Sequence, residues 1–283
     1  MSGALVLVAT PIGNLGDLSP RAVEALRLAD VIAAEDTRRT RVLLSHAGIP
    51  AGRRLRALHA HNEAEGAARI VEEVRAGRRV AYATDAGMPG ISDPGERLVR
   101  ACVDAGLAVE VVPGPSAALV ALVLSGLPTA RFVFEGFLPR RGKERRERLA
   151  ALVSETRTAV LFESPRRVAA TIAELAEACG ADRRVAVARE LTKLHEELWR
   201  GTLGEAMARL GGGEARGEHV IVLGPATEQG VVVTDDDLAV ALRAALAAGS
   251  SARDAAAEVA AALGVARRRA YEAAVELRRA TGS

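Results

Sequence analysis

One stretch concentrates residue types that can bind a ligand: Val80-Ala-Tyr-Ala-Thr-Asp-Ala-Gly-Met-Pro-Gly-Ile-Ser-Asp-Pro-Gly95. It begins as an apolar run typical of a buried strand and becomes a loop rich in glycine and proline. Asp93 and Pro94 then predict the start of a helix from about Gly95 to Ala105. Ligands bind where loops leave the carboxyl ends of parallel strands, and glycines admit them close to the backbone. The stretch therefore predicts a ligand-binding loop, and the alternative is a long αβ connection without a ligand.

The chain up to residue 113 alternates short apolar runs with helical segments, which is the pattern of a parallel α/β sheet. The predicted strands are Ala4–Ala9, Val31–Ala34, Leu55–Leu58, the run that begins at Val80, and Ala108–Val112. The predicted helices run from Ser19-Pro20 to Ala29, from Thr40 to Ala47, from after Asn62 to Ala76, and from Gly95 to Ala105. Pro113-Gly114-Pro115 breaks the pattern and predicts a boundary after a domain of residues 1–113.

Residues 114–225 predict a second domain, a mixed sheet with helices. The predicted strands are Arg131–Gly136, Thr158–Glu163, Val185–Leu191, Glu196–Thr202 and Glu218–Leu223, and the third and fourth can pair as an antiparallel hairpin. A charged helix is predicted at Gly142–Ser154, and Ser164-Pro165 predicts the cap of another that ends at Cys179.

Residues 226–283 predict a helical tail. Ala226–Thr234 is typical of a linker, and helices are predicted at Asp235–Ala248, Ser251–Leu263 and Ala266–Arg279. The join at Leu263-Gly264-Val265 resembles a helix-turn-helix, and a small helical bundle is the alternative.

Composition excludes several classes of protein. The formal net charge is only +2, and no apolar run approaches the roughly 20 residues of a membrane span. Cys102 and Cys179 form neither a metal spacing nor a disulfide framework, so a reducing cytoplasm is the expected location. Gly13-Asn-Leu-Gly16 is not a dinucleotide fingerprint, and the sequence has no P-loop, zinc pattern or Gly-x-Ser-x-Gly elbow. Covalent, redox and metal chemistry are therefore all disfavoured.

Four stretches resemble the tetrapyrrole-methylase superfamily of S-adenosylmethionine enzymes: Thr10-Pro-Ile-Gly-Asn-Leu-Gly-Asp17 with Ser19, Ala34-Glu-Asp-Thr-Arg38, Thr84–Gly95 and Pro113-Gly-Pro-Ser116. Glu135-Gly-Phe-Leu-Pro139, Phe162-Glu-Ser-Pro165 and Arg189-Glu-Leu-Thr-Lys193 extend the similarity to its ribosomal RNA branch, the small-subunit rRNA cytidine 2′-O-methyltransferases. The resemblance covers nearly the whole chain.

The resemblance implies an α/β, two-domain tetrapyrrole-methylase-like fold (class III SAM methyltransferase) with a helical C-terminal extension. It implies a homodimer that methylates a cytidine ribose in the decoding region of 16S rRNA, free or in the small subunit, with S-adenosylmethionine in the cleft between the domains. By position, the donor contacts fall at Ala9, Thr10, Asp85, Ala86, Gly87, Pro89, Ser116, Ala117, Phe162, Ala188 and His219. Asp85-Ala86-Gly87 replaces the Gly-Asp-Pro of many tetrapyrrole enzymes, which puts the role of the carboxylate in doubt.

Ser116 has two interpretations. The hinge before it can place a helix N-terminus at the cleft, with the hydroxyl as a ligand of the donor. The alternative is that Ser116 only caps that helix.

A ribose hydroxyl is a weak nucleophile, so a general base or a cation that helps to remove its proton is expected. The candidates are Glu35, Asp36, His61, Glu163, Glu190 and Lys193. Each acid can instead cap a helix or pair with Arg38 or Arg189, and His61 can simply be solvated. Lys193 is one of two lysines in an arginine-rich chain, and a desolvated lysine can lose its proton.

A basic run predicts the RNA contact. Six cations against two acids give +4 within residues 139–148. The predicted RNA contacts are Arg38, Arg140, Arg141, Lys143, Arg145 and Arg146. The alternative is a solvated helix face with i,i+4 ion pairs. Two other functions stay open: methylation of a tetrapyrrole-like metabolite, and a non-catalytic RNA-binding or assembly role.

Overall fold

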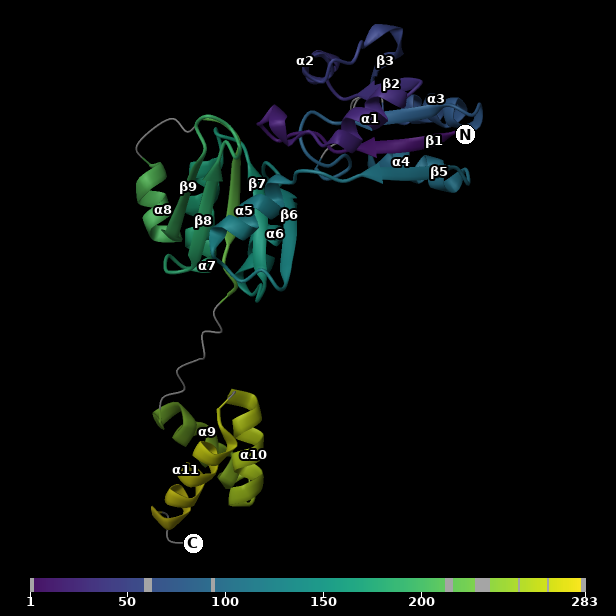
Figure 1. The fold of residues 1–283 in the computed structure, drawn as a ribbon. Coiled ribbons are helices and arrows are strands. Elements are labelled where there is room, and N and C mark those ends of the chain that lie inside the picture. Colours follow the sequence, from purple (N-terminus) through teal and green to yellow (C-terminus); the bar gives the residue numbers. More distant parts are fainter. Residues whose placement is uncertain are drawn as a thin grey trace. The chain divides into compact units, whose positions relative to one another are not determined.

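A computed structural model describes residues 3–58, 63–92, 95–211, 216–226, 235–248, 250–263 and 265–280. The chain forms two compact units, Met1–Pro225 and Ala226–Ser283. Within these described ranges, the first unit contains two five-stranded sheets and the second contains three helices (Figure 1).

The first sheet is parallel, as the alternating pattern predicted. Its order is β3-β2-β4-β1-β5, with strands β1 (Ala4–Val8), β2 (Val31–Ala34), β3 (Leu55–Ala57), β4 (Arg79–Ala83) and β5 (Ala108–Val112). One face packs on α1 (Pro20–Leu28) and α2 (Thr37–His46), and the other packs on α3 (Glu63–Arg75) and α4 (Glu96–Asp104). The short apolar strands therefore form the middle layer of an α/β/α sandwich.

The direction of winding reverses between β1 and β4. From β1 the chain crosses to β2, on the far side of β4, and from β4 it crosses to β5, on the far side of β1. Ligands of doubly wound sheets bind at the carboxyl ends of strands at such a switch point. The loops that leave β1 and β4 meet there.

The second sheet is mixed, as predicted, with order β6-β7-β10-β8-β9. Its strands are β6 (Phe132–Phe137), β7 (Thr158–Glu163), β8 (Arg184–Arg189), β9 (Glu197–Thr202) and β10 (His219–Leu223). Only β6 and β7 run parallel, and β8 and β9 form the predicted antiparallel pair. Helix α5 (Ala117–Ser125) packs on one face, whereas α6 (Lys143–Val153), α7 (Val168–Cys179) and α8 (Leu203–Leu210) pack on the other.

Two helix starts differ from the prediction. Helix α2 begins at Thr37 rather than Thr40, because the Asp36 side chain accepts a hydrogen bond from the Arg38 amide and caps the helix. Helix α7 begins at Val168 rather than after Ser164-Pro165. The Ser164 carbonyl accepts bonds from the amides of Arg167 and Val168, so a turn comes before the helix. The cap predicted at Asp93-Pro94 lies outside the described residues.

The second unit is a three-helix cluster of α9 (Asp235–Ala247), α10 (Ala252–Leu263) and α11 (Arg267–Ala280). Its core contains Leu238, Leu242, Val259 and Ala270. Ser251 caps α10, because its hydroxyl accepts from the Asp254 amide at 3.2 Å. The predicted linker, beyond residue 226, lies outside the described residues. No described helix of the chain is long and apolar enough to cross a bilayer.

Arg183 connects segments of the second sheet layer through polar contacts. Its buried guanidinium donates to the carbonyls of Leu152, Val153, Glu155 and Gly224, which joins the end of α6 to the end of β10. Arginine suits this position because its planar fork presents several donors at once.

Replacing Arg183 with methionine should lower the free energy of unfolding of the first unit by about 2–4 kcal/mol, since it leaves buried carbonyls without donors. Urea unfolding followed through Trp199, the single tryptophan, measures the change. The matched control is Arg184→Met, which alters the exposed neighbour. Equal losses in the two variants would contradict the role given to Arg183.

Candidate active site

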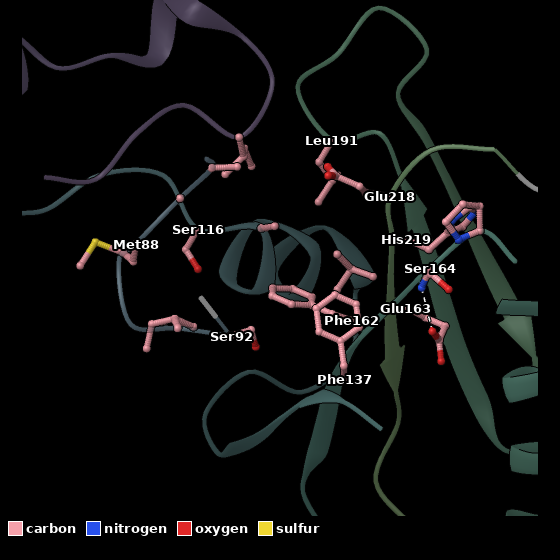
Figure 2. Close-up of a pocket in the computed structure, with 17 residues that line it drawn as sticks. Met88, Ser92, Ser116, Phe137, Phe162, Glu163, Ser164, Leu191, Glu218 and His219 are labelled. Carbon is pink, nitrogen blue, oxygen red and sulfur yellow. Dashed lines mark hydrogen bonds between the residues drawn. The ribbon is translucent and has the colours of Figure 1, made fainter. Parts of the chain in front are cut away.

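A cavity of about 290 Å³ lies between the loops of the first sheet and the strand ends of the second. Figure 2 shows Met88, Ser92 and Ser116 on one side of it, and Leu191, Glu218 and His219 on the other. Its volume is near the lower end for small-molecule sites. We call it the apolar pocket, because Ile12, Ile91, Phe137, Phe162, Leu191 and Val220 are among its lining residues.

Two backbone hydrogen bonds fix the loops that leave β1 and β4. The Thr10 amide donates to the Gly87 carbonyl at 2.9 Å, and the Gly87 amide donates to the Thr10 carbonyl at 3.0 Å. The Thr10 hydroxyl adds a bond to the Thr84 carbonyl at 3.2 Å. Gly87 has φ +81°, a conformation that favours glycine, while a Cβ would meet nothing closer than 3.5 Å. Conformation, rather than lack of space, therefore requires this glycine.

Ser116 precedes α5 and lines the apolar pocket. It occupies the N-cap position, but its side chain makes no capping hydrogen bond. The interpretation of Ser116 as a simple helix cap is therefore wrong. A hydroxyl at a helix N-terminus is left to face the pocket.

Aromatic residues gather at the apolar pocket. The ring of Phe162 contacts those of Phe134 and Phe137 edge-on, with centroids 5.1 and 5.6 Å apart. Phe162 and Phe137 line the cavity, and Phe137 is 51% exposed. Such a surface can bind a flat heterocycle, since aromatic rings prefer stacked or edge-on contacts.

Backbone strain occurs at the same place. Among the described residues, the non-glycine residues with positive φ are Ser92 at +61°, Glu190 at +50° and Thr192 at +64°. Ser92 lines the apolar pocket, and the other two flank Leu191, which also lines it. Residues held in such conformations cluster at ligand sites because surrounding contacts must enforce them.

A second cavity of about 350 Å³ shares Ile12, Ala86 and Glu218 with the first. Its other lining residues include Thr10, Arg39, Thr84, Asp85 and Lys193. We call it the polar pocket. One shared boundary thus separates an apolar site from a charged site.

The predicted donor contacts fall into three groups. Those that line the apolar pocket are Ala86, Gly87, Ser116, Ala117, Phe162 and His219, and those that line the polar pocket are Thr10, Asp85 and Ala86. Ala9, Pro89 and Ala188 are buried and line neither cavity. Sequence reasoning missed Met88, Ile91, Ser92, Phe137, Leu191 and Glu218. Five of these, all except Glu218, lie within motifs quoted above, but an apolar residue in a loop carries no sign of its ligand.

Most predicted general bases are already committed to other groups. Asp36 caps α2 and forms an ion pair with Arg38, whose hydrogen bonds lower the pKa of the carboxyl. Glu163 is buried and accepts from the Ser164 amide, from Arg167 and from the Thr171 hydroxyl. His61 lies outside the described residues.

The prediction that Lys193 can lose its proton is wrong. Its ammonium lies 2.9 Å from carboxylates of both Glu190 and Glu218. Burial opposes the charge, but these two carboxylates outweigh it and raise the pKa of Lys193. The lysine stays protonated, and Glu190 is committed to it.

Two carboxyls differ from the others. Burial raises the pKa of Glu35, and burial likewise raises the pKa of Asp85. The Asp85 amide donates to Glu35 at 3.3 Å, and the Asp36 amide donates to Asp85 at 3.1 Å. Asp85 lines the polar pocket, whereas Glu35 lines neither cavity.

His219 belongs to a polar row at one end of the second sheet. Register pairs it with Glu163 on one side and Arg189 on the other, and Arg189 pairs with Glu197. Burial lowers the pKa of His219, and its Nδ1 lies 3.0 Å from the Gly217 carbonyl. A carbonyl only accepts, so Nδ1 carries the proton of the neutral ring.

The basic run is divided between surface and interior. Arg140, Arg141 and Arg146 are exposed, and Lys143 lies 3.5 Å from Glu147. The prediction that Arg145 contacts RNA is wrong. This residue is 7% exposed and donates to Glu174, Thr171 and the Pro139 carbonyl. It anchors α6 and cannot reach a phosphate. Arg38 is exposed beside Asp36.

The family model of the Tetrapyrrole (Corrin/Porphyrin) Methylases matches residues 4–207. The chain belongs to this family. Proteins named Ribosomal RNA small subunit methyltransferase I are similar over most of their length. The Synechocystis protein is 44% identical over 97% of this chain and 98% of its own, and that of Mycobacterium tuberculosis H37Rv is 46% identical over 99% and 98%.

Solved structures of other proteins share the fold. Uroporphyrin-III-C-methyltransferase from Thermus thermophilus has a TM-score of 0.56 at 24% identity, covering 78% of this chain and 94% of its own. Diphthine synthase has a TM-score of 0.61 at 16% identity, covering 78% and 89%. The predicted tetrapyrrole-methylase fold class is confirmed, while the boundary at residue 113 stays a prediction. Among the described residues, no three metal-ligating side chains gather into a site.

Glu35 should lower the free energy of unfolding of the protein as pH rises. A raised folded-state pKa means that the native state binds more protons than the unfolded state, so stability falls from about pH 4 upward through that pKa. The free energy of unfolding of the wild type minus that of the Glu35→Gln variant should therefore decrease as pH rises over this range.

Glu110→Gln provides a control of opposite sign, because the hydrogen bond from Arg79 lowers the pKa of Glu110. The contribution of Glu110 to stability is lost as pH falls. The free energy of unfolding of the wild type minus that of Glu110→Gln should therefore increase as pH rises. The same slope in both variants would contradict the environment described for Glu35.

Proposed function

We propose that the protein is an S-adenosylmethionine-dependent methyltransferase that modifies the 2′-hydroxyl of a cytidine ribose in the decoding region of 16S rRNA. Membership of a methylase family supports the reaction class. The names of relatives that are 44–50% identical to the chain, Ribosomal RNA small subunit methyltransferase I, support small-subunit rRNA as substrate. A substrate of this kind is found in the cytoplasm, and a homodimer stays a prediction of the resemblance.

The apolar pocket fits the donor. Its aromatic lining suits adenine, and the Ser116 hydroxyl and the loop backbone at Ala86 can bond the ribose and amino-acid ends. A related T. thermophilus enzyme, 22% identical, has been solved with S-adenosylhomocysteine. The uncommitted hydroxyl of Ser116 is the observation that carries the assignment, because capping does not explain it.

Bound S-adenosylmethionine supplies a methyl group activated by a positive sulfur. The protein then has to exclude water and align the two reactants, and alignment alone can provide a large share of the rate. The apolar lining serves the first purpose. The bonds between Thr10 and Gly87 serve the second by fixing the boundary shared by the two pockets.

Replacing Ser116 with alanine should weaken S-adenosylhomocysteine binding about tenfold, the loss of one hydrogen bond. Stability should change little, because the hydroxyl makes no capping bond. Calorimetric titration and urea unfolding test the two statements.

Ser19→Ala is the matched control. Its hydroxyl caps α1 by accepting from the Ala22 amide at 3.1 Å. This variant should lose about 1 kcal/mol of stability and no donor affinity. A stability loss in Ser116→Ala with unchanged affinity would return Ser116 to a structural role.

The exposed arginines of the basic run should contribute to RNA affinity by neutralising phosphates. Alanine at Arg140, Arg141 and Arg146 should reduce the salt slope of small-subunit rRNA binding by about two to three, and leave donor affinity unchanged. Filter binding between low and moderate salt measures the slope.

The control replaces Arg21, Arg53 and Arg97, three exposed arginines on other elements, and so removes the same charge. An equal drop in slope would show an effect of total charge rather than a contact. No drop in the first variant would assign the basic run to a solvated face.

A further inference from the structure

The polar pocket has a composition suited to a sugar phosphate. Thr10 and Thr84 provide hydroxyls, Arg39 and Lys193 provide cations, and Asp85 provides a carboxylate. It adjoins the apolar pocket along Ile12, Ala86 and Glu218. Any group bound there lies next to a donor bound in the apolar pocket.

Thr84 lines this pocket and has a buried hydroxyl that no described residue uses. Its side chain follows β4, and the residue is 2% exposed. Its Oγ1 has no hydrogen-bond partner within the described part of the chain. A buried hydroxyl without a partner loses free energy, so a ligand that bonds it is favoured. Its carbonyl, in contrast, is occupied by the Thr10 hydroxyl.

Asp85 presents one oxygen to the same pocket. Its Oδ1 accepts from the Asp36 amide at 3.1 Å, which fixes the carboxylate. Its Oδ2 lies 3.5 Å from Arg39, longer than a good ion pair, and the side chain is 23% exposed. The competing acids Glu190 and Glu218 are both paired with Lys193. Asp85 is thus positioned by one oxygen and available through the other.

We propose that the polar pocket holds the ribonucleotide to be methylated, that Thr84 orients its sugar, and that Asp85 accepts the proton of the reacting hydroxyl. This rests on the function proposed above. The hydroxyl oxygen forms a bond to the methyl carbon while its O–H bond breaks and the proton passes to Asp85. The carbon–sulfur bond of the donor breaks, and its electron pair stays on the sulfur, which becomes neutral.

The surroundings of Asp85 favour this role. The charged groups that face it are Glu35 from the end of β2, Asp36 at the N-cap of α2, Arg39 of α2, and Glu218 beside β10. Burial raises the pKa of Asp85, which makes the carboxylate a stronger base than a solvated one. Arg39, 63% exposed, lies where it can bind a flanking phosphate.

The Thr84→Val variant tests the polar pocket independently of the apolar pocket. It keeps the shape of the side chain and breaks no hydrogen bond of the described residues. We expect methyl transfer to small ribosomal subunits, measured as kcat/KM for the particle at saturating donor, to fall about tenfold. Calorimetric affinity for S-adenosylhomocysteine should stay within twofold. The control, Thr129→Val, makes the same chemical change at an exposed site and should alter neither quantity.

Each other outcome has one meaning. Unchanged transfer in Thr84→Val would overturn the nucleotide assignment. A tenfold loss of donor affinity would overturn it too, by making the polar pocket part of the donor site. Absence of donor binding in the wild type would remove the proposed function itself, before any variant is considered.

Asp85→Asn tests the proton acceptor. We expect the transfer rate at saturating donor to fall at least 100-fold. The wild-type rate should fall as pH is lowered through the raised pKa of Asp85, whereas the residual rate of the variant should lack that dependence. Retained donor affinity shows that the variant is folded. A variant that keeps the wild-type pH profile, or its rate, would overturn the role of Asp85.

Discussion

The pair of backbone hydrogen bonds between Thr10 and Gly87 is the constraint on which the site depends. It joins the loops that leave two adjacent parallel strands at the switch point of the first sheet. Ile12 and Ala86, one or two residues from the bridge, line both pockets. A shift of this bridge would therefore displace the boundary between the proposed donor and nucleotide sites. Because main-chain groups form it, the positive φ of Gly87 matters more than its lack of a side chain.

The second sheet contributes lining from strand ends and from one strained loop. Glu190 and Thr192 adopt positive φ on either side of Leu191, and the Thr192 hydroxyl accepts from the Asn14 amide at 3.1 Å. The same loop carries Lys193, whose two carboxylate partners hold it in place. The strain is thus balanced by contacts to the first-sheet loop and by an ion-pair cluster. These contacts position Leu191 at the apolar pocket.

Arginine performs two different kinds of work in this lysine-poor chain. Arg145 and Arg183 are buried, and their guanidinium groups bond carbonyls, a hydroxyl and a carboxylate within the second sheet layer. Arg140, Arg141 and Arg146 stay exposed on or beside α6. A run of basic residues therefore does not act as a single surface. The helical period turns Arg145 inward, toward Glu174 and Thr171 of α7.

The sequence alone determined the alternation of strands and helices, the parallel first sheet, the mixed second sheet and the family. Each follows from local signals: apolar runs, capping residues such as Ser19, and ordered motifs such as Thr10–Asp17 and Thr84–Gly95. Only the tertiary structure decided which polar groups are already satisfied. It showed that Ser116 does not cap its helix, that Lys193 forms ion pairs with two acids, that Arg145 is buried, and that Asp85 lines the polar pocket. The physical reason is that hydrogen-bond satisfaction and burial depend on partners that are distant in the chain, such as Thr10 and Thr84, 74 positions apart, and Asn14 and Thr192, 178 positions apart. The spacing of residues along the sequence does not show which distant groups form these hydrogen bonds.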